Sequence, residues 1–124
     1  MKTAQHVMTR ALHTISPDAS VADASRKMQQ HKIHSLIVER CDGLDAYGII
    51  TDTDIVQKVL APDFNPAAVY VREVMSKPII TIPPDCTLFE MAQLMTRHHI
   101  NHLPVFDGTQ LVGMVSSTDI FSVK

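Results

Sequence analysis

The chain has 124 residues, 45% of them hydrophobic, and a formal net charge of −2 at pH 7. This length suits one compact domain, or two small halves that share a core. The charge lacks the basic excess of nucleic-acid-binding proteins, and no apolar run reaches the roughly 20 residues that span a membrane. With no signal-peptide pattern and only two cysteines, the sequence predicts a cytoplasmic protein.

In chain order, the first half reads as a strand, a helix, two strands and a second helix. An extended piece at residues 12–15 meets a turn sequence, Ser-Pro-Asp. A helix follows, because Ser20 and Asp23 have the spacing of a capping box and apolar residues recur after them at helical intervals. Its buried stripe is predicted as Val21, Ala24 and Met28. The later elements are expected at residues 35–38, at residues 47–50 and from Thr51 onward.

Residues 61–73 contain two prolines and are predicted to connect the two halves. The second half repeats the order of the first, and Thr87 and Glu90 announce its helix at capping-box spacing. Its other elements are expected at residues 79–82, 103–106 and 111–115 and from Ser116 onward. Pro104 lies in one of these strands, which indicates an edge position or an irregular strand.

The two halves are copies of one unit. Residues 7–38 align with residues 74–105 without a gap, and residues 48–55 align with residues 113–120 after a shorter loop. Turn residues, apolar spacing and polar positions all agree in this alignment, which indicates an internal duplication. The predicted fold is therefore α+β, with two pseudo-symmetric β-α-β-β-α repeats packed through their sheets. The predicted ranges are 7–60 for the first repeat, 61–73 for the connector and 74–124 for the second repeat.

Each copy ends in a glycine, a hydroxyl residue and an aspartate at a fixed spacing, Gly-x-x-Ser/Thr-x-x-Asp. The hydroxyl and the carboxylate stand at the start of a helix, where free N–H groups suit a phosphate. A carboxylate can also accept hydrogen bonds from both hydroxyls of a ribose. The same spacing is that of a capping box, and judged by spacing alone capping is the more frequent role. For Asp54 and Asp119 both interpretations stay open at this point.

This series of motifs resembles a tandem cystathionine-β-synthase-type (CBS) domain pair, also called a Bateman module. The resemblance covers residues 7–124, and the whole series occurs twice in order. It implies a stand-alone regulatory module that binds an adenosyl ligand, such as AMP, ADP, ATP, S-adenosylmethionine or NAD, and reports it to an effector protein. It also implies a homodimer. Because the sequence holds no nucleophile or metal motif of a known enzyme class, we expect no catalytic residue.

The resemblance also implies two ligand clefts, each made of residues from both repeats. In the first, adenine, ribose and phosphate would contact Thr14, Ala19, His34, Ser35, Met114, Ser116, Thr118 and Asp119, with His102 reaching the phosphates. The mirror cleft would use Thr81, Cys86, Asn101, His102, Ile49, Thr51, Thr53 and Asp54. The ribose-binding aspartate of the family falls at Asp54 and Asp119, which favours ribose binding over capping. No lysine or arginine stands at the matched phosphate positions, so AMP is easier to bind than ATP unless Arg10, Arg72 or Lys77 reaches in.

Two other functions fit parts of the sequence. A module with empty clefts would serve as a dimerisation or protein-interaction platform, and a panel of ligands would separate it from a sensor. The seven histidines suggest a metal site, but zinc needs three or four convergent ligands, and the consecutive His98 and His99 point in different directions. We therefore expect no metal and no cofactor other than the regulatory nucleotide.

Overall fold

The computed structural model describes residues 2–43, 45–77 and 79–123, so Lys124, the last residue of the predicted second repeat, lies outside it. The described chain divides into two compact units. Residues 13–79 form the first-repeat unit, and residues up to Leu12 join those from Ile80 onward in the second-repeat unit. The opening segment therefore folds with the second repeat, so the folded units and the sequence repeats divide the chain differently. Among the described helices, none has the length and apolar character to cross a membrane.

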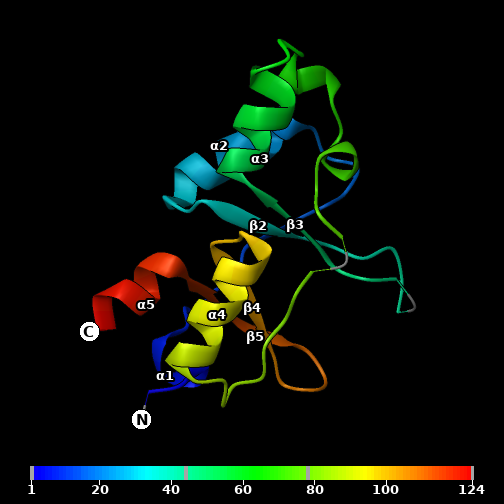
Figure 1. Ribbon diagram of the computed structural model, residues 1–124. Helices are drawn as coiled ribbons and strands as arrows, with labels where there is room; N and C mark the ends of the chain where they lie inside the picture. The colour runs from blue at the N-terminus through cyan, green and yellow to red at the C-terminus, as the bar shows by residue number, and fades with distance from the viewer. Residues whose placement is uncertain (1, 44, 78, 124) are drawn as a thin grey trace. The chain divides into compact units, whose positions relative to one another are not determined.

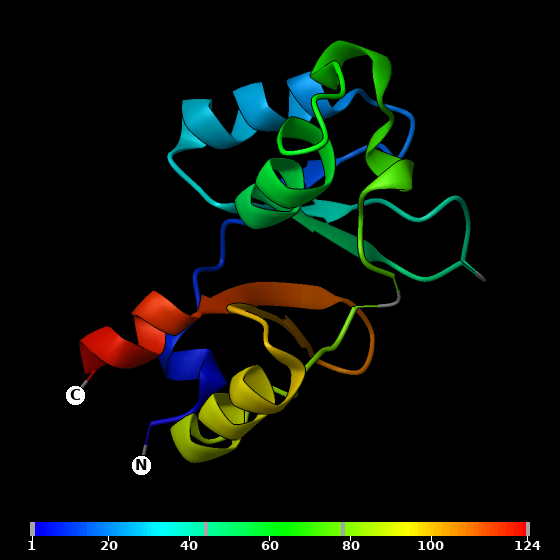
Figure 2. The ribbon, with the colours of Figure 1, turned by 45° about the horizontal axis from the view of Figure 1, so that its top comes forward.

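The first-repeat unit places its main helices on one face of a small sheet. Its elements are β1 (Thr14–Ile15), α2 (Val21–His31), β2 (Ser35–Val38), β3 (Gly48–Thr51), α3 (Asp52–Ile55), the π-helix η1 (Val56–Leu60), and the 3-10 helices η2 (Pro66–Ala68) and η3 (Val71–Glu73). Among the described residues, β2 lies between β1, which runs parallel to it, and β3, which runs antiparallel. Figures 1 and 2 show α2 and α3 on the same side of this sheet.

The core of this unit lies between α2 and the sheet. The helix begins where Ser20 Oγ accepts a hydrogen bond from the N–H of Asp23 at 3.0 Å, as the capping spacing predicts. The apolar stripe predicted for this helix is buried, which confirms that prediction. It packs with strand residues, and together these buried side chains are Val21, Ala24, Met28, Leu36, Val38 and Ile50.

The second-repeat unit consists of α1 (Ala4–Val7), α4 (Leu88–His98), β4 (His102–Phe106), β5 (Leu111–Ser116) and α5 (Ser117–Val123). Its strands β4 and β5 pair antiparallel. At the start of α4, the Glu90 N–H donates to Thr87 Oγ1 at 3.2 Å and the Thr87 N–H donates to Glu90 Oε1 at 3.0 Å, which confirms the predicted capping box. Figure 2 shows α1 and α4 on one side of the sheet. The buried core includes Ala4, Met91, Met95, Leu103, Val105 and Val115.

The opening strand of the second repeat differs from its prediction. Residues 79–82 form only a bridge, in which Ile82 pairs with Val105. At the matching place in the first-repeat unit, the N–H of Ile37 donates to the carbonyl of His13 at 3.0 Å. Pro104 stands where the first repeat has Ile37, and proline has no N–H to donate. The missing hydrogen bond explains the reduced strand. The strand that contains Pro104, β4, has a register shift between Val105 and Phe106, which fits the irregular strand predicted from the proline.

The two repeats exchange their opening segments. Thr9 of the first repeat exchanges two backbone hydrogen bonds with Met114 of the second repeat, both 2.9 Å long. Ser76, which opens the second repeat, does the same with Ile49 of the first repeat at 2.9 and 3.0 Å. Each compact unit therefore depends on a short segment that belongs, by sequence, to the other repeat.

A glycine makes room for a methionine beside each of these exchanged segments. A Cβ atom on Gly113 would lie 2.8 Å from Cγ of Met8, and one on Gly48 would lie 2.8 Å from Sδ of Met75. Real Cβ atoms do not approach so closely, because interiors are already packed to high density. The glycine that begins each closing motif therefore allows the exchanged segment to pack closely against the strand, because it has no side chain at that point.

Candidate functional site

The closing motif of each repeat forms a reciprocal capping box at the end of a strand. In the first-repeat unit, the Asp54 N–H donates to Thr51 Oγ1 at 3.1 Å and the Thr51 N–H donates to Asp54 Oδ2 at 3.0 Å. In the second-repeat unit, the Asp119 N–H donates to Ser116 Oγ at 3.2 Å, and the Ser116 N–H donates to Asp119 Oδ2 at 2.8 Å. The capping role considered from the spacing is thus confirmed in both repeats. It fixes each carboxylate at the start of its helix, and the ribose-binding role stays a prediction.

Several predicted ligand residues of the first repeat share the face of the sheet that points away from the core. Side chains alternate between the two faces along each strand. The residues next to the core residues of β1, β2 and β3 therefore face away from the core, and these are Thr14, Ser35, Ile49 and Thr51. Ser35 and Thr51 are direct partners in the β2–β3 register.

The second repeat places its predicted residues in the same way. Leu103 and Val115 belong to the core, so His102, Met114 and Ser116 face away from it. His102 and Ser116 are direct partners in the β4–β5 register. The predicted combination of each group with residues of the other repeat stays a prediction.

The remaining predicted residues lie outside these strand faces. Cys86 is buried in the core, where burial raises the pKa of its thiol, so it serves packing. Ala19 is held to the connector, since its carbonyl accepts a hydrogen bond from the N–H of Val71 at 2.9 Å. The exposed members of the set are His34, Thr53, Thr81, Asn101 and Thr118.

The structure adds a residue that sequence reasoning missed, Asp52 at the start of α3. Its Oδ2 lies 3.0 Å from His34 Nδ1, and its Oδ1 accepts a hydrogen bond from the Thr53 N–H at 2.8 Å. Ser117 stands at the equivalent position of the second repeat and carries no charge. The sequence feature that could have revealed Asp52 is the difference between the two closing motifs, Thr-Asp-Thr-Asp and Ser-Ser-Thr-Asp.

The starts of α3 and α5 therefore differ in charge. At α3, the first three N–H groups all donate to protein oxygens, and the first turn holds the carboxylates of Asp52 and Asp54. Lys58 offsets part of this charge, with its Nζ 3.4 Å from Asp54 Oδ1. Among the described residues of α5, Asp119 is the acidic residue of the first turn. Lys58 thus balances one of the two carboxylates at α3, and what distinguishes the two helix starts is the placement of charge: Asp54 has a cation beside it, whereas no ion pair among the described residues includes Asp119.

Two of the three cations considered for phosphate binding, Arg72 and Lys77, are ion-paired within the first-repeat unit. Arg72 pairs with Asp18, and its guanidinium carbon lies 4.1 Å from the ring centre of Tyr70. Lys77 Nζ lies 2.6 Å from Asp45 Oδ1. A backbone N–H and this lysine together hold the pKa of Asp45 well below its usual range. The ion pair of Arg72 holds the connector, and that of Lys77 holds the segment after it, to the rest of the first-repeat unit.

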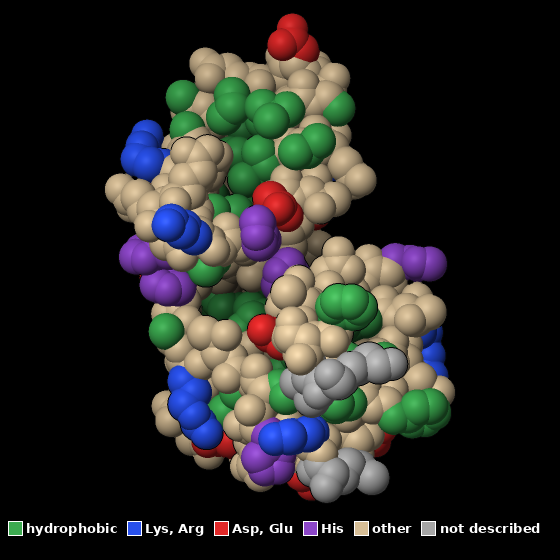
Figure 3. Space-filling view, turned by 90° about the vertical axis from the view of Figure 1, so that its left-hand side faces the viewer, with side chains coloured by type: hydrophobic (Ala, Val, Ile, Leu, Met, Phe, Trp, Pro, Cys, Tyr) green, Lys and Arg blue, Asp and Glu red, His purple; other side chains and the backbone are tan. Residues whose placement is uncertain are grey.

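The histidines are exposed except for His13 and His102, which are half-buried, and they do not form a metal cluster in the part of the chain that the structure describes. Figure 3 shows several histidine side chains at the surface, and the side chain of His34 is 75% exposed. No group of three or more histidine, cysteine, aspartate or glutamate side chains among the described residues is arranged to hold a metal ion. His98 and His99 are exposed at the end of α4, where the helix dipole favours basic side chains.

Comparison with known proteins identifies the family. The family described as CBS domain matches residues 4–61 and residues 71–124. The chain belongs to the CBS domain family. CBS domain-containing protein YhcV of Bacillus subtilis is 32% identical over 120 residues, which cover 97% of this CBS pair and 84% of that protein. Uncharacterized protein MK0525 of Methanopyrus kandleri is 34% identical over 119 residues, 95% of this chain, but the chain spans only 60% of that protein's length.

A solved structure gives the same fold. The hexameric CBS-CP12 protein from bloom-forming cyanobacteria has a TM-score of 0.94 and 39% identity to this CBS pair, over 98% of this chain and 71% of that chain. The predicted CBS resemblance and the α+β fold with two repeats are therefore confirmed. The protein is a tandem CBS module, a regulatory and ligand-binding kind of domain.

Proposed function

We propose that this CBS pair is a regulatory sensor without catalytic activity that binds an adenine nucleotide of the AMP type. The observation that carries the proposal is the pair of matching hydroxyl–carboxylate motifs, Thr51–Asp54 and Ser116–Asp119, at the ends of β3 and β5. Each motif has a polar strand partner, Ser35 or His102, on the face that points away from the core. The regulatory nature of tandem CBS modules supports this function.

The capped carboxylates suit a ribose because the cap uses only one oxygen of each. Asp119 Oδ2 accepts the Ser116 N–H, and no ion pair among the described residues includes Asp119. Its Oδ1 can therefore accept a ribose hydroxyl while the cap stays intact. Because the cap already holds the carboxylate in place, little ordering cost is added when the ligand binds.

The charges favour a ligand with one phosphate, bound at the second-repeat motif. Arg72 and Lys77 are already ion-paired, which leaves Arg10 as the remaining one of the three cations considered for a triphosphate. Lys58 lies 3.4 Å from the second carboxylate oxygen of Asp54, whereas no ion pair among the described residues includes Asp119, so Asp119 offers the more accessible ribose acceptor. We therefore expect AMP to bind more tightly at the Ser116–Asp119 motif.

Titration calorimetry with AMP tests the ribose-binding role. Asp119→Ala removes both the cap and the proposed ribose acceptor, so we expect the AMP affinity to fall about ten- to a hundredfold. Glu90→Ala is the matched control, because it removes a capping carboxylate of the same kind at the start of α4. Both substitutions should lower the free energy of unfolding by about 0.5–2 kcal/mol, but only Asp119→Ala should change the affinity.

Asp54→Ala reports on the other motif in the same experiment. We expect a smaller loss of AMP affinity than for Asp119→Ala, because Lys58 already lies beside the second carboxylate oxygen of Asp54. If both aspartate variants keep the affinity of the unaltered protein while losing stability, the carboxylates only cap their helices and the site assignment is wrong.

A thermal-shift panel of AMP, ADP, ATP, S-adenosylmethionine and NAD separates the possible ligands. A ligand at a hundredfold excess over its Kd stabilises the folded state by about 2.7 kcal/mol, which is easily measured. The alternative function is a ligand-free dimerisation or protein-interaction module. That module would show no shift with any member of the panel.

We also propose that the module forms a homodimer and passes its signal to an effector protein. Val56 and Phe121 occupy equivalent positions in the two repeats and are 54% and 78% exposed, and Figure 3 shows apolar side chains at the surface. The hexameric state of the cyanobacterial relative supports assembly. Light scattering at tens of micromolar should give twice the mass of one chain, and Phe121→Glu should lower it. A mass of one chain for the unaltered protein would contradict the dimer.

A further inference from the structure

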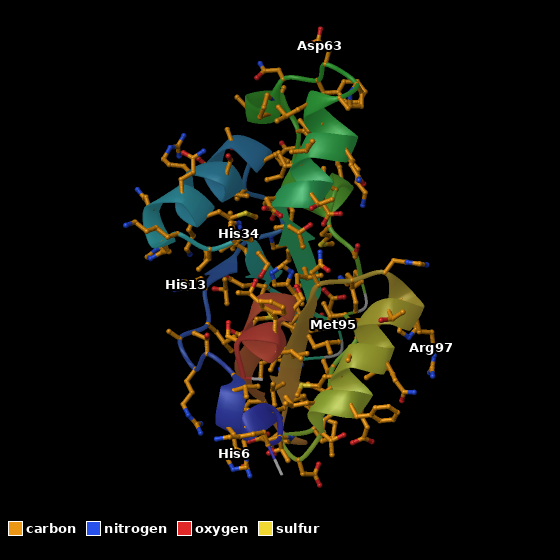
Figure 4. All side chains as sticks on the ribbon, turned by 60° about the vertical axis from the view of Figure 1, so that its left-hand side comes forward. His6, His13, His34, Asp63, Met95 and Arg97 are labelled. Carbon is orange, nitrogen blue, oxygen red and sulfur yellow. The ribbon has the colours of Figure 1, made fainter. Side chains whose placement is uncertain are left out.

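Three basic side chains meet where α2 lies against β1 in the first-repeat unit. The ring of His13, which directly precedes β1, stacks on the ring of His31 at the end of α2, with centroids 4.1 Å apart and planes inclined by 30°. One turn earlier, Lys27 Nζ donates a hydrogen bond to the carbonyl of Thr14 in β1. Figure 4 labels His13 at this place. We call His13, Lys27 and His31 the basic contact.

The second repeat makes the same contact with apolar side chains. Its residues at these positions are Ile80, Leu94 and His98. Ile80 and Leu94 both pack against the core of the second-repeat unit. The contact between the first helix of each repeat and the segment at its opening strand therefore contains titratable groups in the first repeat and mainly apolar contact in the second.

The surroundings of the basic contact disfavour added protons. Burial, the neighbouring His31 and Lys27 together lower the pKa of His13. Glu39, which accepts a hydrogen bond from Thr14 Oγ1 at 3.1 Å, is the acidic group bonded to this part of β1. Among the ion pairs of the described residues, none joins Glu39 to the basic contact. Below about pH 6.5 an unfolded histidine is protonated more readily than His13 in the fold, so acid favours the open form.

We propose that the basic contact is a proton-sensitive latch of the first repeat. It holds α2 on β1 when the imidazole of His13 is neutral, and it loosens α2 when protonation of His13 adds a positive charge beside Lys27. The second repeat keeps its equivalent helix in place under the same conditions, because Ile80 and Leu94, which stand in place of His13 and Lys27, do not titrate. Acidification to about pH 6 and below therefore loosens one repeat of the module selectively, with or without a nucleotide.

Hydrogen exchange followed by mass spectrometry tests the latch on the full chain. Peptides from α2 and α4 are compared at about pH 7.5 and about pH 5.5, after correction for the intrinsic exchange rates. The two helices occupy equivalent places, so α4 is an internal control. We expect the protection of α2 to fall several-fold on acidification and that of α4 to stay nearly constant; each unit of pKa difference corresponds to about a tenfold change.

His13→Ile gives the first repeat the residue that the second repeat has at this position. In this variant, we expect the protection of α2 to become as insensitive to pH as that of α4. Lys27→Leu removes one positive charge and should weaken the pH response without abolishing it. An equal loss of protection in α2 and α4 of the unaltered protein would overturn the proposal. An unchanged response of α2 in folded His13→Ile would overturn it as well.

A measurement on the unaltered protein covers the case in which the variants do not fold. Nuclear magnetic resonance titration of the histidine rings should show His13 taking up its proton at lower pH than a histidine in an unfolded peptide of the same local sequence. The same or a higher midpoint for His13 would overturn the latch.

Discussion

At the start of α3, the carboxylate of Asp52 lies within hydrogen-bonding distance of His34 and in the same turn as the capped carboxylate of Asp54. The start of α5 has Ser117 in place of Asp52 and keeps the capped carboxylate of Asp119. The capping geometry is the same at both places, so the difference between them is one of charge. A phosphate close to these positions would meet a carboxylate at α3 and a hydroxyl at α5, while Lys58 balances the other carboxylate at α3.

Exchanging these two residues should exchange the preference for a phosphate. Ser117→Asp should weaken AMP binding at the second-repeat motif about tenfold, which corresponds to roughly 1.4 kcal/mol of added repulsion. Asp52→Ser should strengthen AMP binding at the first-repeat motif by a similar factor. Calorimetry with AMP and with adenosine measures both effects, since adenosine lacks the phosphate. Equal changes for the two ligands would mean that the residue acts through local structure and not through its charge.

Gly113→Ala should destabilise the second-repeat unit by about 1–3 kcal/mol, because the added Cβ atom would overlap the side chain of Met8. Gly43→Ala is the matched control, since nothing lies within 4 Å of a Cβ atom at that position. Urea denaturation measures both variants. If Gly113→Ala loses no more stability than the control, the methionine moves aside freely and the glycine is not required for the close approach.

Among the elements, the two opening strands differ although their sequences align. In the first-repeat unit, two backbone hydrogen bonds hold the opening strand: the Ile37 N–H donates to the His13 carbonyl at 3.0 Å, and the Glu39 N–H donates to the Ile15 carbonyl at 2.9 Å. The second repeat keeps the bond from the Phe106 N–H to the Ile82 carbonyl, at 2.9 Å, but Pro104 cannot make the other. One residue type thus changes a strand into a bridge.

Pro104→Ile restores the donor that the first repeat has at this position. The backbone N–H of the new isoleucine can then donate to the carbonyl of Ile80. We expect this bond to raise the free energy of unfolding by up to about 1 kcal/mol. The greater freedom of the unfolded chain without the proline offsets part of that gain. The reverse change, Ile37→Pro, should cost at least about 1–3 kcal/mol. Urea denaturation gives both values. A loss of stability in Pro104→Ile would show that the proline itself supports the bridge.

Local signals explain which elements could be predicted from the sequence. The helix starts at Ser20 and Thr87 were predictable because a cap and an apolar stripe lie within a few residues of each other. The exchange of opening segments was not predictable, because Thr9 and Met114 are distant in sequence and no periodic pattern records their pairing. At the site, the spacing predicted the hydroxyl and the carboxylate of each closing motif. It could not separate capping from ligand binding, and Asp52 was missed because it breaks the repeat.

For the whole molecule, the exchange means that no cut in the connector separates two complete folding units. A cut after Asp63, which lies in an exposed turn and is labelled in Figure 4, leaves Ser76 on one fragment and its partner Ile49 on the other. It likewise separates Thr9 from Met114. Each fragment then lacks a segment that pairs with its own closing strand.

The two fragments, residues 1–63 and 64–124, should therefore be poorly folded alone and should fold when mixed. Circular dichroism and urea denaturation of each fragment and of an equimolar mixture measure this. A cooperative unfolding transition for either fragment alone would contradict the dependence on the exchanged segments.

The exchange of opening segments also bears on how such a chain can arise. A protein with a single repeat would have an opening segment and a closing strand that pair with the same elements of a second copy. Two such copies would trade their opening segments, as in a domain-swapped dimer. Duplication and fusion of the gene would keep both pairings and need only a linking peptide between them. The two short backbone pairings of this chain are thus the ones that a swapped dimer of half-length chains would need.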